Sequence, residues 1–186
     1  MADSEYKGEN IVFIVGCPRS GTTWLQRLLA SHPDIFTGQE SDIFDIYIGP
    51  QLRAWKRDLI PANSGRGVIG LGCYFTEGKF IQNIKSYLML LLEPMICNLK
   101  EGQLFLEKTP SHALFIPEIH QLLPKAKFIH IIRDPRDVIA SLIAVSKGWG
   151  WYWAPKTPKA AANMWYQHVM SVQKFKQNMP SDQFLE

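Results

Sequence analysis

Short, unbroken apolar runs alternate along the chain with segments whose apolar residues recur at helical spacing. Residues 11–15 form a continuous, β-branched run that stops at Gly16, as in a central strand buried on both faces. The leucines from Leu25 to Leu29 then follow a helical pattern that ends before Pro33. The first part of the chain therefore predicts a strand, a tight loop and a helix.

The same alternation continues to the end of the sequence. Further strands are predicted at residues 34–37, 103–107, 127–132 and 184–186. Further helices are predicted at residues 43–59 with an interruption at Gly49-Pro50, at 78–100, at 111–123, from Pro135 with Asp134 as N-cap, and at 157–177. Alternating strands and helices favour an α/β fold of three layers, with a central parallel sheet and helices on both faces.

The length of 186 residues fits one α/β domain of ordinary size. Residues 1–10 are polar and we expect them to form a disordered tail, with the folded domain spanning residues 11–186. Because the last predicted strand runs to the final residue, we expect a domain truncated at its C-terminal end. A short edge strand is the alternative.

Composition excludes several classes of protein. Hydrophobic residues make up 46% and charged residues 20%, as in folded globular proteins. A net charge of +3 is too small to indicate a nucleic-acid partner or a membrane surface, and the longest apolar run, residues 88–92, is too short to span a bilayer. The three cysteines show neither disulfide nor zinc spacing, so we expect a reducing compartment such as the cytoplasm.

The loop after the first strand is the strongest chemical signal. Residues 16–21 have the G-x-x-x-x-G spacing of a phosphate loop, but Thr22 stands where nucleoside-triphosphate loops have lysine. The helix that follows directs unpaired N–H groups at a bound anion, Ser20, Thr22 and Thr23 add hydroxyl donors, and Arg19 supplies the positive charge. We therefore predict an anion site that is not a Mg-dependent ATPase or kinase loop.

A second candidate site follows the strand at residues 127–132. Arg133 leaves that strand, and Ser141 lies two turns into the next predicted helix, so both side chains are able to face one phosphate. An arginine at this place is otherwise a surface ion pair. Because ligands of open α/β sheets bind beyond the carboxyl ends of the strands, the two sites together predict a ligand with two separated anionic groups.

Three segments resemble the sulfotransferases that use 3′-phosphoadenosine 5′-phosphosulfate (PAPS), a family with a P-loop-type fold. They are Pro18-Arg-Ser-Gly-Thr-Thr-Trp24, Glu107-Lys-Thr-Pro110, and Ile131-Ile-Arg-Asp-Pro-Arg-Asp-Val138 with Ser141, in a match that runs over residues 11–186. The resemblance implies that Arg19, Ser20, Gly21, Thr22 and Thr23 hold the 5′-phosphosulfate, that Arg133 and Ser141 hold the 3′-phosphate, and that Trp24 stacks on adenine.

The resemblance also implies the chemistry. Arginine rather than lysine in the loop is similar to the tyrosylprotein and carbohydrate branches, and Gly38-Gln39-Glu40 is similar to their segment with the catalytic glutamate. Glu40 is therefore the candidate base for a hydroxyl or amine acceptor, with Glu107 and His112 as substitutes. Lys108 and Arg19 are expected to stabilise charge during in-line transfer of the sulfuryl group.

Two other functions stay open at this point, a P-loop nucleotide kinase-like enzyme and a non-catalytic nucleotide-binding module. The family normally continues with an adenine-contacting strand and a basic loop over the 3′-phosphate, which this sequence lacks. The acceptor is equally open among carbohydrate, peptide tyrosine, lipid and small molecule. The sequence does not indicate an oligomeric state.

Several weaker sequence patterns do not support a functional site or allow two interpretations. We interpret the glycines of residues 65–70 as a flexible loop and not as a dinucleotide site. His112 and His120 lack metal-site spacing, so we predict capping and surface roles and no metal. Trp165 and Tyr166 are expected in the core. A loop at residues 147–158 either forms an acceptor lid or covers the helices with its aromatic residues, Trp149, Trp151, Tyr152 and Trp153.

Overall fold

A computed structural model describes residues 6–63, 67 and 70–186 of the chain. It contains a five-stranded sheet in the order β2-β3-β1-β4-β5, and every pair of neighbouring strands is parallel. The strands are β1 (Ile11–Gly16), β2 (Ile35–Thr37), β3 (Leu104–Lys108), β4 (Lys127–Ile131) and β5 (Phe184–Leu185). Each strand overlaps a segment that the hydrophobic pattern predicts.

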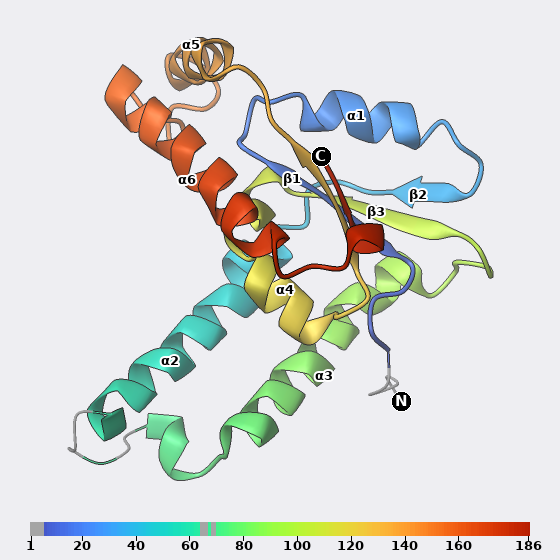
Figure 1. Ribbon diagram of the computed structural model, residues 1–186, viewed down its shortest axis with the longest axis vertical. Helices are drawn as coiled ribbons and strands as arrows, with labels where there is room; N and C mark the ends of the chain where they lie inside the picture. The colour runs from blue at the N-terminus through green and yellow to red at the C-terminus, as the bar shows by residue number, and fades with distance from the viewer. Residues whose placement is uncertain (1–5, 64–66, 68–69) are drawn as a thin grey trace.

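Six α-helices connect and cover the strands in the described part of the chain (Figure 1). They are α1 (Thr22–Leu29), α2 (Gly49–Asn63), α3 (Glu77–Ile96), α4 (Ile116–Leu122), α5 (Pro135–Ser146) and α6 (Pro158–Lys176). A π-helix, η1 (Ile43–Ile48), and the 3₁₀ turns η2 (Gly70–Cys73), η3 (Pro110–Leu114) and η4 (Ser181–Gln183) complete the elements.

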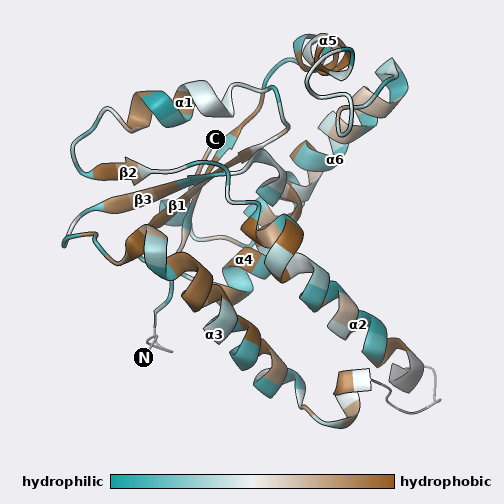
Figure 2. Ribbon diagram, turned by 180° about the vertical axis from the view of Figure 1, so that it is seen from behind, coloured by the Kyte–Doolittle hydropathy of each residue, from teal (hydrophilic) through white to brown (hydrophobic). Residues whose placement is uncertain are grey.

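Alternate residues of β1 divide the core between two faces of the sheet. Val12 and Ile14 pack with Leu25 and Leu29 of α1 on one face. Phe13 and its neighbours two residues away on the strand face a larger cluster formed with α2, α3, α4 and η1. Figure 2 shows the hydrophobic colour gathered in the central strands and in the part of α3 nearest to them. The predicted three-layer fold is therefore confirmed.

Phe13 lies at the centre of the larger cluster and is fully buried. Its ring stacks on Phe128 of β4 at a centroid distance of 5.6 Å and meets Phe44 of η1 edge-on at 6.2 Å. The His112 ring of η3 lies edge-on at 5.9 Å from the same phenyl ring. One side chain of β1 therefore joins the sheet to the elements that carry the polar network described below.

Two helix boundaries differ from the sequence prediction. The segment at residues 43–59 is not interrupted at Gly49-Pro50, because η1 passes directly into α2. Gly49 permits this continuity, since a Cβ there would lie 2.4 Å from the Phe115 ring. The predicted helix at residues 111–123 is instead η3 followed by α4, and Phe115 separates the two with a non-helical backbone.

Two other predicted segments fall partly outside the described residues. Of the predicted tail, residues 6–10 contact the domain: Tyr6 packs on the larger cluster and the Lys7 carbonyl accepts the Lys125 N–H at 2.8 Å. Residues 1–5 and most of the glycine-rich segment 65–70 lie outside the description. Within the described ranges, no helix combines the length and the apolar character needed to cross a bilayer.

The packing of Phe13 predicts a large loss of stability on truncation. Phe13→Ala removes a fully buried ring between two layers, so the free energy of unfolding should fall by about 3–5 kcal/mol. The matched control, Tyr74→Ala, removes a ring that is 83% exposed and should change it by less than about 0.5 kcal/mol. Chemical denaturation followed by circular dichroism measures both. Equal, small effects would contradict this account of the core.

Candidate functional site

The loop between β1 and α1 has the backbone that an anion site needs. Arg19 and Gly21 have positive φ angles of 75° and 101°, and Gly21 is the N-cap of α1 without any side-chain cap among the described residues. The Leu25 N–H donates to the Gly21 carbonyl at 3.1 Å. The N–H groups of the first turn of α1 are therefore free to bind a ligand.

Close contact between β1 and β4 brings the second predicted site to this loop. Gly16 pairs with Ile131, and a Cβ at Gly16 would lie 2.6 Å from the Ile131 carbonyl oxygen, so glycine is required for the approach. Beyond the strand ends, the Arg19 Nε donates to Ser141 Oγ of α5 at 3.1 Å. The two predicted sites are thus adjacent.

The two sites line one cavity of about 200 Å³, whose walls are Arg19, Gly21, Thr22, Thr23, Arg133 and Ser141. Arg133 is half-exposed, and its Nη2 lies 3.1 Å from an Asp137 carboxylate oxygen one turn further along. Two guanidinium groups, hydroxyls and helix N–H groups therefore surround a single space, and this donor set suits a ligand with two anionic groups.

The segment that carries Arg133 is held from both sides. Trp165 of α6 donates its indole N–H to the Arg133 carbonyl at 3.1 Å, a role that the prediction of a core residue does not include. Tyr166, also expected in the core, is 56% exposed.

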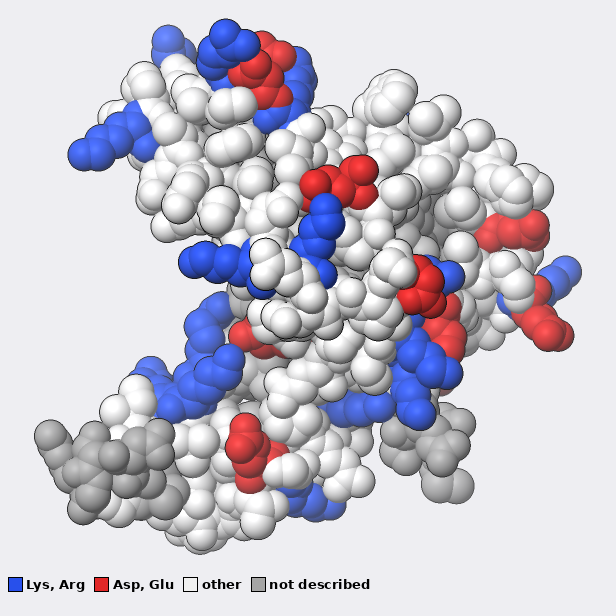
Figure 3. All heavy atoms as spheres, in the orientation of Figure 1, with Lys and Arg blue, Asp and Glu red and all other residues white. Residues whose placement is uncertain are grey.

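Asp134 caps α5 by accepting the Arg136 N–H at 2.8 Å, and hydrogen bonding to Arg136 lowers the pKa of Asp134 to about 2. Charges of both signs gather over α5 in Figure 3.

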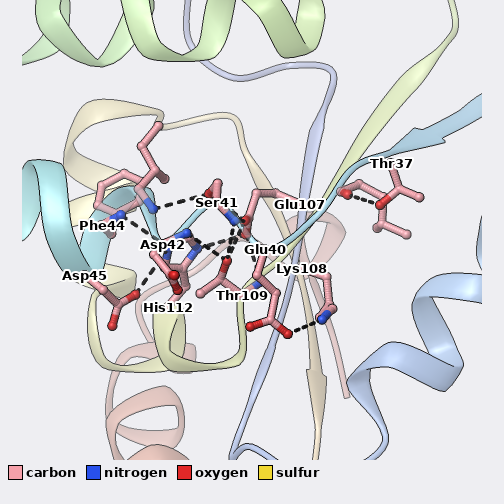
Figure 4. A network of polar contacts seen from close by, with 12 residues as sticks. Thr37, Glu40, Ser41, Asp42, Phe44, Asp45, Glu107, Lys108, Thr109 and His112 are labelled. Carbon is pink, nitrogen blue, oxygen red and sulfur yellow. Dashed lines mark hydrogen bonds and ion pairs between the residues drawn. The ribbon is translucent and has the colours of Figure 1, made fainter. Parts of the chain in front are cut away.

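Glu40 and Lys108 form an ion pair, and Glu40 lines a second, larger pocket together with Arg19, Thr22 and Thr23 of the anion loop (Figure 4). Lys108, at the end of β3, is only 5% exposed, whereas Glu40 in the loop after β2 is 47% exposed. A carboxylate that solvent reaches therefore lies beside a buried cation, as the predicted roles of base and charge-stabilising group require.

Glu107 organises the loop that carries Glu40. One of its carboxylate oxygens accepts hydrogen bonds from Ser41 Oγ at 2.8 Å and Thr109 Oγ1 at 2.7 Å, and the other accepts the Thr109 N–H at 3.1 Å. Thr109 Oγ1 in turn accepts the N–H groups of Ser41 and Asp42, at 3.1 and 3.3 Å. These bonds fix the residues that directly follow Glu40 (Figure 4).

His112 completes this network from η3 and is fully buried, so a surface role for it is wrong. Its Nε2 accepts the Phe44 N–H at 3.2 Å, which leaves Nδ1 to donate to Glu107 at 2.9 Å. Asp45 approaches the same Nε2 at 3.5 Å, and burial raises the pKa of Asp45. Since Glu107 and His112 are both enclosed and bonded to each other, neither is placed to act as the substitute base.

A larger pocket of about 590 Å³ adjoins the anion loop and Glu40. Its lining residues are Pro18, Arg19, Thr22, Thr23, Glu40, Asp42, Pro110, Ser111, Leu114, Trp149, Tyr152, Trp153, Met164 and His168. The Arg19 guanidinium lies 5.8 Å from the centre of the Trp149 ring. Aromatic residues of the loop after α5 therefore form a wall of this pocket, as the lid interpretation expects, while Trp153 also packs on the α5–α6 cluster.

Two other predicted site residues, Ser20 and Trp24, line neither of the two pockets. Ser20 is buried in the loop, and Trp24 is 70% exposed on α1. Gln26 was not predicted, yet its side-chain amide donates to Thr37 Oγ1 at 2.7 Å and to the Gly38 carbonyl at 2.9 Å. This residue links the helix of the anion loop to the segment that leads to Glu40.

Metal-ligating side chains do not cluster in the described ranges: no group of three or more histidine, cysteine, aspartate or glutamate residues there is arranged to hold an ion.

Comparison with known proteins gives one consistent set of matches. The model of the sulfotransferase family matches residues 11–186. A relative from Caenorhabditis briggsae is 33% identical over 141 residues, which cover 73% of this chain and 43% of the relative. Protein-tyrosine sulfotransferase 1 of Homo sapiens is 28% identical over 146 residues, which cover 75% of this chain and 35% of that protein. The chain thus spans less than half the length of these curated relatives.

Solved structures share the fold. The sulfotransferase domain of the Synechococcus PCC 7002 olefin synthase superposes with a TM-score of 0.62 at 20% identity, over 97% of this chain and 66% of that chain. A sulfotransferase from Mycobacterium tuberculosis H37Rv gives a TM-score of 0.57 at 19% identity, over 98% of this chain and 62% of that one. At these identities the likeness concerns the fold alone.

The environment of Glu107 predicts a loss of stability in acid. Burial alone would raise the pKa of Glu107, but the His112 ring and the hydrogen bonds from His112, Thr109 and Ser41 hold this pKa below its ordinary value of 4.5. The folded protein therefore binds this proton more weakly than the unfolded chain does. The stabilisation is complete above about pH 4.5 and is lost as the pH falls through the lower pKa of the folded state.

Glu107→Gln should consequently lower the free energy of unfolding by about 3–5 kcal/mol at neutral pH and remove part of its decline in acid. The control Glu101→Gln changes an exposed carboxylate in a turn and should leave both quantities unchanged. Denaturation curves recorded across the acid range measure the effect. An unchanged acid profile in Glu107→Gln would show that this carboxylate is not the stabilising group.

Proposed function

Because the chain belongs to the sulfotransferase family, we propose that the protein transfers a sulfuryl group from PAPS to a hydroxyl acceptor by in-line displacement. The family resemblance of the motifs is confirmed, and the curated relatives agree with the tyrosylprotein branch. The observation that carries the proposal is the cavity lined by both the Arg19 loop and the Arg133–Ser141 segment. It shares Arg19, Thr22 and Thr23 with the larger pocket that Glu40 lines.

The cavity suits the two phosphate groups of this donor. Arg19, Thr22, Thr23 and the N–H groups of α1 would hold the 5′-phosphosulfate. Arg133 and Ser141, which line the same cavity from the segment after β4, would hold the 3′-phosphate. In this arrangement the phosphate replaces Asp137 as the partner of Arg133, which exchanges one charge-assisted hydrogen bond for another.

When bound, the donor supplies an electrophilic sulfur atom. Glu40 takes the proton of the acceptor hydroxyl as that oxygen attacks, since its carboxylate borders both the anion loop and the larger pocket. Lys108 and Arg19 stabilise the negative charge that develops on the leaving phosphate oxygen. Hydrogen bonds to Ser41 hold Glu40 in place for this step, because Thr109 accepts the Ser41 N–H and Glu107 accepts the Ser41 hydroxyl.

The acceptor in this proposal is a hydroxyl group on an aromatic ring, of the tyrosyl type. Support comes from the pocket next to Glu40, whose walls include Trp149, Tyr152 and Trp153. Aromatic walls bury apolar area and make edge-on or stacked contacts with the ring of a phenol. The names of relatives such as human protein-tyrosine sulfotransferase 1 point to the same acceptor class.

A nucleotide kinase-like function has weaker support. Thr22 occupies the position at which a kinase P-loop uses lysine to span the terminal phosphates of ATP. The two arginines of this cavity come instead from two separate loops, an arrangement that favours a ligand phosphorylated at both ends.

Nucleotide binding distinguishes these functions. The protein should bind adenosine 3′,5′-bisphosphate without added metal, and more tightly than Mg-ATP, because only the bisphosphate places a phosphate on each wall of the cavity. Isothermal titration calorimetry measures both affinities. Tight binding of Mg-ATP with no binding of the bisphosphate would overturn the proposed donor.

The proposed base gives a second prediction. Glu40→Gln should lower kcat for sulfuryl transfer to a phenol by roughly 10²–10⁴-fold, because the amide does not accept the proton. The affinity for adenosine 3′,5′-bisphosphate should change little in the same variant. Asp42→Asn, which alters the neighbouring carboxylate in the same pocket, is the matched comparison and should retain most of kcat. A larger loss of kcat in Asp42→Asn than in Glu40→Gln would reassign the base.

A further inference from the structure

His168 is a buried histidine of α6 with no part in the steps above. It lines the larger pocket together with Glu40 and the aromatic loop, although its side chain is only 5% exposed. The residue before it on the same face of the helix, Met164, lines the pocket as well. A nearly enclosed polar ring therefore forms part of an otherwise largely apolar and aromatic wall.

One ring nitrogen of His168 is committed to its own helix. Nδ1 lies 2.7 Å from the Met164 carbonyl oxygen one turn earlier. Because a carbonyl oxygen only accepts hydrogen bonds, Nδ1 carries the proton. Burial lowers the pKa of His168, opposed in part by this hydrogen bond, so the ring is neutral at physiological pH and Nε2 keeps its lone pair.

Nε2 is the nitrogen that faces away from this bond, and no group in the described part of the chain bonds to it. It differs from Nε2 of His130, which is sealed in the interior without a partner. The His168 atom is not among the sealed atoms, and His168 is one of the residues that line the larger pocket. A ligand that covers this acceptor nitrogen and excludes water from it loses free energy unless the ligand itself supplies a donor.

We propose that His168 Nε2 accepts a hydrogen bond from an N–H group of the acceptor molecule and thereby selects phenols that carry an amide. This inference rests on the proposed function. Glu40 receives the proton of the reacting hydroxyl, the aromatic wall contacts the ring, and His168 binds the amide N–H. Tyrosyl residues within a peptide are the chemical class that combines these three features. His168 is in this account a specificity residue and takes no part in the chemical step.

Two matched phenols test this proposal by binding alone. N-acetyltyramine has a secondary amide with one N–H, whereas N-acetyl-N-methyltyramine has none. With adenosine 3′,5′-bisphosphate at saturation, the protein should bind the secondary amide roughly threefold to tenfold more tightly, the range for one neutral hydrogen bond. His168→Leu should lose this preference, and His168→Gln, whose amide oxygen accepts in place of Nε2, should retain part of it. His32→Leu, on the exposed loop before β2, should keep it fully.

A second readout needs no variant. The His168 imidazole resonances in NMR spectra should shift on addition of the secondary amide and not on addition of the tertiary one. Equal affinities for the two phenols in the unmodified protein, or a preference that persists in His168→Leu, would overturn the assignment of His168. A fall in kcat in His168→Leu without any change in phenol affinity would overturn it as well, in favour of a proton-transfer role. Failure to bind the nucleotide in the first step would instead overturn the proposed function.

Discussion

The site depends on the direct, parallel pairing of β1 with β4. Gly16 and Ile131 are partners at the ends of these strands, and they approach so closely that no side chain fits at Gly16. The chain leaves both strands on the same edge of the sheet, so Arg19 and Ser141 come within hydrogen-bond distance although 122 residues separate them. A cavity with positive charge on two walls follows from this one contact, because each wall is the continuation of one strand.

The adjacent strand β3 contributes two consecutive residues to the candidate site, Glu107 and Lys108. Successive side chains of a strand point to opposite faces, so Glu107 and Lys108 leave β3 in opposite directions. Glu107 binds the Ser41 and Thr109 side chains and the ring of His112, whereas Lys108 pairs with Glu40. Two consecutive residues therefore perform two tasks: one fixes the loop that carries the carboxylate, and the other supplies the cation beside that carboxylate.

The hydrophobic pattern is sufficient to predict the strands and the adjacency of the loops that follow β1 and β4, because buried parallel strands have unbroken apolar runs and their carboxyl ends share one edge. Contacts between distant side chains were not predictable in this way. His168 and Ala161 share one face of α6 at helical spacing, and this pattern predicts only a packing face. The structure adds that His168 also lines the pocket beside η3. Similarly, the pattern predicts one helix over residues 111–123, but the chain makes a 3₁₀ turn over Pro110–Leu114 that buries His112 against Glu107.

The central claim is that two loops bind the two phosphate groups of one nucleotide. The most direct measurement uses calorimetry to compare the affinities of an Arg133→Ala variant for adenosine 5′-phosphate and adenosine 3′,5′-bisphosphate with those of the unmodified protein. The account predicts that this change weakens binding of the bisphosphate by roughly tenfold to a hundredfold, the value of a charge-assisted hydrogen bond, and leaves binding of the 5′-phosphate unchanged. Arg136→Ala, which removes an equal charge from an exposed neighbour, should affect neither ligand. Equal weakening of both nucleotides in Arg133→Ala would contradict the claim.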